Sequence, residues 1–101
     1  MALSLDRNSG LAIVYYALGR KADSDAALSR AERDVATQGP FKIASIHAIR
    51  GEANAAFHWL ERAYAEKDYS LQYIKGDRRF RALQKDARYK PLLQKMNLPP
   101  E

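Results

Sequence analysis

The sequence predicts an all-α protein of stacked antiparallel helical hairpins that ends in short C-terminal capping helices. Three observations support this fold class. Apolar residues recur at helical spacing in four segments, glycine or proline stands at the segment boundaries, and no segment alternates apolar and polar residues. With 101 residues, 47% of them hydrophobic, we expect one domain, 1–101, with a modest core.

The first expected hairpin joins two helices at a glycine. Apolar residues recur at helical spacing before Gly19, a helix stop, which predicts a helix over about 6–18. Asp23 and Asp25 suit the positive end of a helix dipole, so a second helix is predicted from there to about Thr37.

The second expected hairpin begins at Pro40, a residue suited to the first turn of a helix. Its first helix is predicted over about 40–50 and ends at Gly51. Its second helix, about 53–66, carries an apolar stripe.

The C-terminal segment is less regular. A short helix is predicted over 69–75. Asp77 and Asp86 are each followed by a short apolar run, which is typical of N-cap residues. Asn97 is suited to closing the last helix.

A repeat organises the first two-thirds of the chain. Gly19 and Gly51 are 32 residues apart, and large and small residues recur in step around them. Antiparallel helices approach closely only where small side chains meet, and such hairpins bury their apolar faces by stacking. The expected close contacts are Ala12 with Ser24, and Ala44 with Ala56.

This pattern resembles the tetratricopeptide repeat (TPR) family. The matching residues are Leu11-Ala12, Tyr15, Gly19, Leu28 and Ala31, then Ile43-Ala44, Gly51, Ala56, Leu60 and Ala63. The resemblance implies a TPR-like α–α superhelix with repeat units at about 5–37 and 38–68 and a capping tail at about 69–101. The sequence departs from the family at Pro40, where tryptophan is preferred, and its period is shorter than the usual ~34.

The tail is similar to C-terminal tails of larger bacterial regulators, among them adenylate cyclase-like, serine/threonine kinase and winged-helix proteins. The residues that carry this resemblance run from Leu71 to Pro100. It implies that the chain is a C-terminal domain or fragment of a larger bacterial protein. Pro91 departs from the pattern, and we therefore expect the last helix to begin nearer Lys90.

The resemblance also implies a site, because the first helix of each TPR unit lines a concave groove. The groove residues would be Ile13, Tyr16, Phe41, Lys42, Ser45 and Ile49. We expect a protein or peptide partner there, or a second copy in a homodimer. The competing interpretation is that the tail folds back and covers this surface, which would make it ordinary core.

An alternative function rests on charge. The segment Lys75–Lys95 holds eight basic and two acidic residues, a net charge of +6, whereas the whole chain carries +5. This favours either a solvated face or an anion-binding or nucleic-acid-binding surface. Its candidate residues are Arg78, Arg79, Arg81 and Arg88.

Other functions are not expected. No nucleophile–base pair, glycine-rich phosphate loop or metal-ligand spacing is recognisable, so we expect no enzyme, cofactor or metal. His47 is interpreted as a packing residue at the core edge, with no carboxylate pair nearby. The chain has no cysteine, no apolar run long enough for a bilayer and no secretory signal pattern, which favours the cytoplasm.

Overall fold

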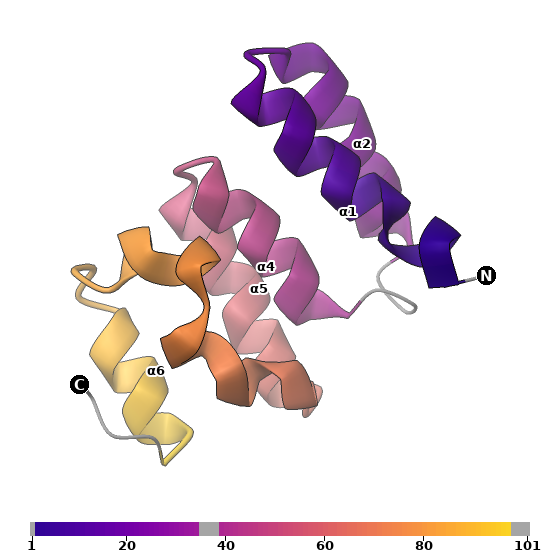
Figure 1. Ribbon diagram of the computed structural model, residues 1–101. Helices are drawn as coiled ribbons and strands as arrows, with labels where there is room; N and C mark the ends of the chain where they lie inside the picture. Colours follow the sequence, from indigo (N-terminus) through magenta and orange to yellow (C-terminus); the bar gives the residue numbers. More distant parts are fainter. Residues whose placement is uncertain (1, 35–38, 98–101) are drawn as a thin grey trace.

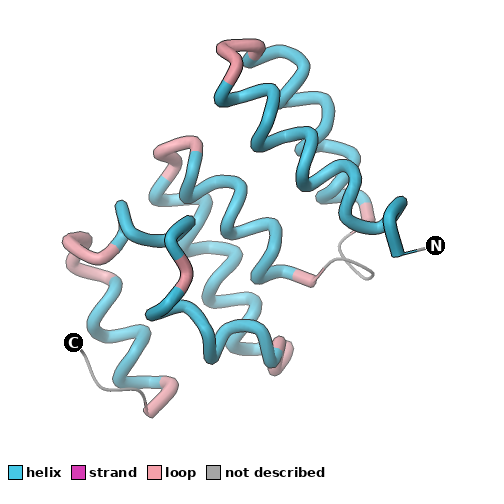
Figure 2. Tube along the Cα trace, in the orientation of Figure 1, coloured by secondary structure: helices cyan, strands magenta, loops and turns pink. Residues whose placement is uncertain are grey.

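The computed structural model describes residues 2–34 and 39–97, with side chains from Ser9 onward. These residues form helices and turns, with no strand among them, so the all-α prediction is confirmed (Figure 2). The elements are α1 (Ala2–Ala17), α2 (Lys21–Arg33), α4 (Pro40–Ile49), α5 (Ala53–Ala65), the 3₁₀ helices η1 (Tyr69–Gly76) and η2 (Arg78–Leu83), and α6 (Tyr89–Lys95).

Two antiparallel hairpins, α1 with α2 and α4 with α5, lie beside each other (Figure 1). Each hairpin turns at the predicted glycine: Gly19 has φ +78° and Gly51 has φ +77°, a left-handed conformation that favours glycine. Helix α1 begins at Ala2, earlier than the predicted start near residue 6. The predicted end of the second helix at Thr37 lies outside the described residues.

The predicted small residues are buried inside the hairpins. Ala12, Ser24, Ala44 and Ala56 are all 0% exposed. The Ser24 hydroxyl donates a hydrogen bond to the Ala12 carbonyl oxygen at 2.7 Å. A serine is therefore accommodated between the two helices, because the Ala12 carbonyl oxygen of the facing helix accepts the hydrogen bond from its hydroxyl.

Helix α4 is the central element, which explains why its sequence is apolar on nearly every side. Ile43 and Ile46 pack with the first hairpin in one core cluster. Phe41, Ala44 and Ala48 belong to a second and larger cluster with α5 and the C-terminal tail. A helix covered on several faces needs apolar residues all round.

The tail (69–97) returns across the second hairpin as two 3₁₀ helices followed by α6 (Figure 1). The Asp77 side chain caps η2 by accepting the Arg79 backbone N–H at 3.0 Å, as predicted. Helix α6 begins at Tyr89, which confirms the expected start near Lys90. It closes at Asn97, whose φ of +61° is the expected left-handed conformation.

The prediction for Asp86 is partly wrong. Its side chain accepts the Arg88 backbone N–H at 2.9 Å, but the N-cap residue of α6 is Arg88 itself. Asp86 therefore closes the turn that precedes the helix.

Asp68 connects the tail to the start of the second hairpin. Its carboxylate accepts the backbone N–H of Phe41 and that of Ser70, each at 3.0 Å. One side chain thus caps both α4 and η1. Gly39 has φ +86°, and a Cβ there would lie 2.9 Å from Asp68 Oδ2, so this approach requires glycine.

Candidate functional site

The predicted groove residues do not form one open surface. The Phe41 side chain is 5% exposed, and its ring centroid lies 4.9 Å from that of Phe80 in η2. Ser45 is fully buried and donates to the Lys42 carbonyl oxygen at 2.6 Å. The tail therefore covers this part of α4, as the competing interpretation described. Lys42 and Ile49 are half-buried.

The α1 members of the predicted groove lie at its joint with the second hairpin. The Tyr16 hydroxyl donates to the Arg50 carbonyl oxygen at 3.2 Å, and the Arg50 guanidinium lies 5.8 Å from the Tyr16 ring centroid. Ile13 is half-buried and packs against the core of the first hairpin. Tyr16 is thus a structural contact between hairpins, although 37% of it stays exposed.

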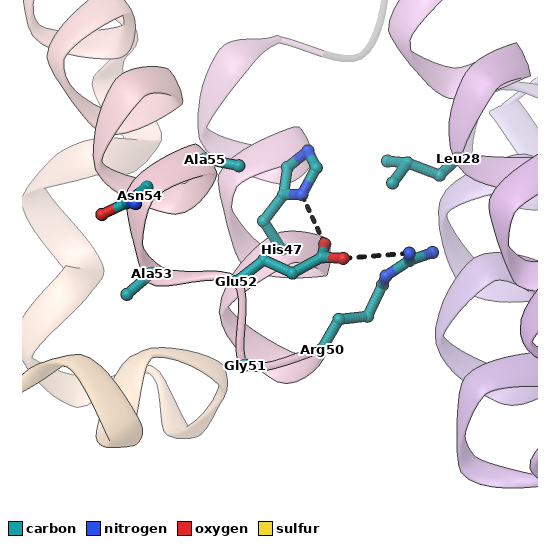
Figure 3. Close-up of a pocket in the computed structure, with 8 residues that line it drawn as sticks. All are labelled: Leu28, His47, Arg50, Gly51, Glu52, Ala53, Asn54 and Ala55. Atoms are coloured by element: carbon teal, nitrogen blue, oxygen red, sulfur yellow. Dashed lines mark hydrogen bonds and ion pairs between the residues drawn. The ribbon is translucent and has the colours of Figure 1, made fainter.

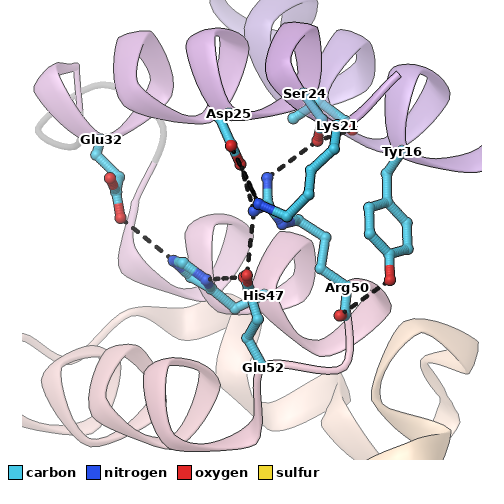
Figure 4. A network of polar contacts seen from close by, with 9 residues as sticks. Tyr16, Lys21, Ser24, Asp25, Glu32, His47, Arg50 and Glu52 are labelled. Atoms are coloured by element: carbon cyan, nitrogen blue, oxygen red, sulfur yellow. Dashed lines mark hydrogen bonds and ion pairs between the residues drawn. The ribbon is translucent and has the colours of Figure 1, made fainter. Parts of the chain in front are cut away.

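A polar network crosses the same joint around Arg50, whose side chain is only 4% exposed (Figure 4). Its guanidinium donates to the Ser24 hydroxyl at 3.0 Å and to the carboxylates of Asp25 and Glu52. Ser24 and Asp25 belong to α2, so Arg50 ties the first hairpin to the second. The Arg50 hydrogen bond holds the pKa of Asp25 below its usual range.

His47 extends this network, which corrects one expectation. It is buried at the core edge, but two carboxylates do contact it. Its Nδ1 lies 2.8 Å from Glu52 and its Nε2 lies 3.2 Å from Glu32 of α2. Both ring nitrogens of His47 therefore lie within hydrogen-bond distance of a carboxylate oxygen. The sequence did not indicate this cluster, because its members come from separate helices.

Next to His47, an open cleft of about 620 Å³ lies at the start of α5 (Figure 3). It is lined by Leu28, His47, Arg50, Gly51, Glu52, Ala53, Asn54 and Ala55. Burial raises the pKa of Glu52, but hydrogen bonds from His47 and Arg50 outweigh it and hold that pKa below its usual value. The Glu52 carboxylate lies between His47 and Arg50, so the lining of the cleft is part of the joint between the hairpins. The described residues contain no group of His, Asp or Glu arranged to hold a metal ion.

The four arginines of the predicted anion-binding surface fall into two pairs. Arg79 forms an ion pair with Asp77, and Arg88 forms one with Asp86. The Arg88 guanidinium also donates to Asn54 and lies 4.6 Å from the Phe57 ring centroid. Arg88 therefore ties the tail to α5, whereas Arg79 pairs within the tail, with the aspartate that caps η2.

Arg78 and Arg81 differ from this structural pair. Both are exposed, and neither makes an ion pair within the described residues. Lys85 and Lys90 are likewise exposed without an ion pair there. The tail therefore presents a net positive surface, because its two acids are already neutralised by Arg79 and Arg88.

The Asp86–Arg88 pair predicts acid sensitivity. The hydrogen bond from Arg88 lowers the pKa of Asp86 from 3.8 to about 2. A carboxylate whose pKa is lower when folded stabilises the fold above its unfolded pKa, and this stabilisation is lost as the pH falls. We therefore expect the melting temperature, followed by circular dichroism, to fall between about pH 4 and pH 2.

At neutral pH, Asp86→Asn should have a lower melting temperature than wild type. Its melting temperature should fall less than that of wild type between about pH 4 and pH 2. Arg88→Gln should flatten the profile in the same way, since Arg88 is the cause of the shift. Unchanged pH profiles in both variants would contradict this assignment.

Two large apolar side chains at the C-terminal end of α1 and in the turn after it are exposed. From Ser9 to Leu18, the first residue of that turn, the chain contains no charged residue. Val14 is 51% exposed and Leu18 is 65% exposed. Leu11, Val14 and Leu18 stand at positions i, i+3 and i+7, so they lie along one side of the helix. Leu11 is half-buried.

Comparison with known proteins adds no relative. No protein-family model, curated protein or solved structure matches this chain. Among the described residues, no helix is long and apolar enough to cross a membrane.

Proposed function

We propose that this chain is a protein-interaction module of TPR-like helical hairpins that associates with a second copy of itself through α1. The observation that carries the proposal is the uncharged stripe of Leu11, Val14 and Leu18, in which Val14 and Leu18 are exposed and Leu11 is half-buried. Leaving large apolar side chains in water is unfavourable by about 25 cal/mol for each Å² of apolar surface. A partner that buries the stripe removes this cost.

The uncharged character of the stripe favours a second copy as the partner. In a twofold dimer the same patch meets itself, so a charge at its centre, near the axis, would face a like charge. None occurs between Ser9 and Leu18. Gly10 and Ala17 flank the stripe and are exposed, and such small residues allow two helices to approach closely.

Substitutions in the stripe test binding more directly than substitutions in the predicted groove. Phe41 is buried, so a charged substitution there would test folding rather than binding. Val14 and Leu18 are exposed, and their replacement should leave the core intact.

We expect the wild-type protein to show twice its monomer mass of 11.4 kDa in light scattering at high concentration and to dissociate on dilution. The double variant Val14→Lys and Leu18→Lys should stay at the monomer mass. It should keep the helical circular dichroism of wild type.

A matched control adds the same two charges to α2. Ala22 and Ala26 are exposed, and Ala22→Lys with Ala26→Lys should dimerise as wild type does. A wild-type protein that is monomeric at every concentration would show the proposal to be wrong. Equal loss of dimer in both double variants would show that charge, not the stripe, controls association.

A further inference from the structure

The exposed edge of the 3₁₀ helices presents side chains that belong neither to the core nor to the α1 stripe. A 3₁₀ helix has three residues per turn, so residues i and i+3 lie on one edge. In η2 this places Phe80 and Leu83 on the buried edge, and both are at most 3% exposed. Arg78 and Arg81 share another edge, which is exposed.

An exposed aromatic ring lies beside this edge. Tyr73 is 68% exposed and, together with Gln72, Gly76, Asp77 and Arg78, lines a shallow hollow of about 660 Å³. The Asp77 carboxylate is turned to Arg79, which it binds through its side chain and backbone. The hollow therefore presents an aromatic ring and a guanidinium that has no ion pair among the described residues.

Tyr69, also on η1, is 84% exposed but lines a different hollow, with Lys67 and Met96. Two large rings left in water on one short helix are unusual for surface positions with no partner. Arg78, which lines the same hollow as Tyr73, and Arg81 carry positive charge that no acidic residue of the tail neutralises. The edge thus combines one exposed ring for stacking, that of Tyr73, with two cations that suit a chain of negative charges.

We propose that this edge of η1 and η2 binds single-stranded nucleic acid, with Tyr73 stacking on a base and Arg78 and Arg81 contacting backbone phosphates. Single strands are recognised by this combination of aromatic platforms and a basic track. An acidic peptide would satisfy the arginines but offers no base for the ring. A duplex is disfavoured, because six-residue η2 is too short to read the major groove as an α-helix does.

The test is fluorescence anisotropy with labelled oligo-dT and oligo-rU at low salt, with heparin as a polyanion that has no bases. Binding to the oligonucleotides should weaken as salt rises, with a slope of about 0.7 in log affinity for each phosphate contact. Arg78→Gln with Arg81→Gln should reduce that slope by about 1.4, the value for two lost contacts. Tyr73→Ala should weaken oligonucleotide binding about five-fold or more but leave heparin binding unchanged.

A control double variant, Arg30→Gln with Arg33→Gln, makes the same charge change on the exposed face of α2. Its oligonucleotide affinity should stay close to wild type. Melting temperatures of all variants should match wild type, since every substituted side chain is exposed. Absence of oligonucleotide binding, or equal losses in the two arginine double variants, would overturn the proposal. Equal effects of Tyr73→Ala on heparin and oligonucleotide would overturn the stacking role.

Discussion

Replacing Phe80 with alanine should lower the free energy of unfolding by about 3–5 kcal/mol, the range for a fully buried phenylalanine. Phe80 is 0% exposed, and its ring packs against Phe41 of α4 at a tilt of 37°. It is the main apolar anchor of η2. Its removal leaves a cavity between the tail and α4 that the short 3₁₀ helix cannot fill.

The measurement is urea denaturation followed by circular dichroism. Tyr73→Ala is the control, because it truncates an aromatic ring on the neighbouring 3₁₀ helix that is 68% exposed, and it should cost less than about 0.5 kcal/mol. Increased binding of a hydrophobic dye to Phe80→Ala would report that Phe41 is uncovered. Similar losses of stability in the two variants would contradict the anchoring role of Phe80.

Arg50→Met should also destabilise the protein strongly, by about 2 kcal/mol. Breaking a fully buried ion pair costs about 3–5 kcal/mol. Arg50 is 4% exposed, but its carboxylate partners Asp25 and Glu52 are 47% and 37% exposed, so solvent screening reduces the loss. The remaining cost comes from the Ser24 hydroxyl and Asp25, which lose their contact with the second hairpin.

The loss of stability in Arg50→Met should be concentrated in the first hairpin. Hydrogen exchange should show lower protection in α2 than in α5, because Arg50 joins the hairpins rather than holding α5 in its own core. Lys21→Met is the control: it removes an exposed partner of Asp25 and should cost less than about 0.5 kcal/mol. A uniform loss of protection in Arg50→Met would contradict a role confined to the joint.

Local chemistry made several elements predictable. Gly19 and Gly51 mark the hairpin turns because glycine adopts the left-handed conformation at a helix end without steric cost. Asp77 and Asn97 were predictable for the same reason, since capping depends on residues close in the chain.

The candidate site was less predictable. Phe41 and Tyr16 are apolar and aromatic at groove positions, but the same residue types serve equally well as core or joint residues. Which role they take depends on Phe80 and Arg50, which lie 39 and 34 residues further along the chain. No local pattern connects these partners.

The sequence by itself determined the helical hairpins, their glycine turns and the small residues between their helices, because those features depend on backbone preferences and on periodicity within a few turns. Only the tertiary structure decided that the tail covers α4, that Asp68 caps two helices and that His47 and Arg50 contact carboxylates of the other hairpin. It also separated the paired arginines from Arg78 and Arg81. These outcomes depend on which side chains meet across space, and charge or hydrophobicity along the chain does not specify that.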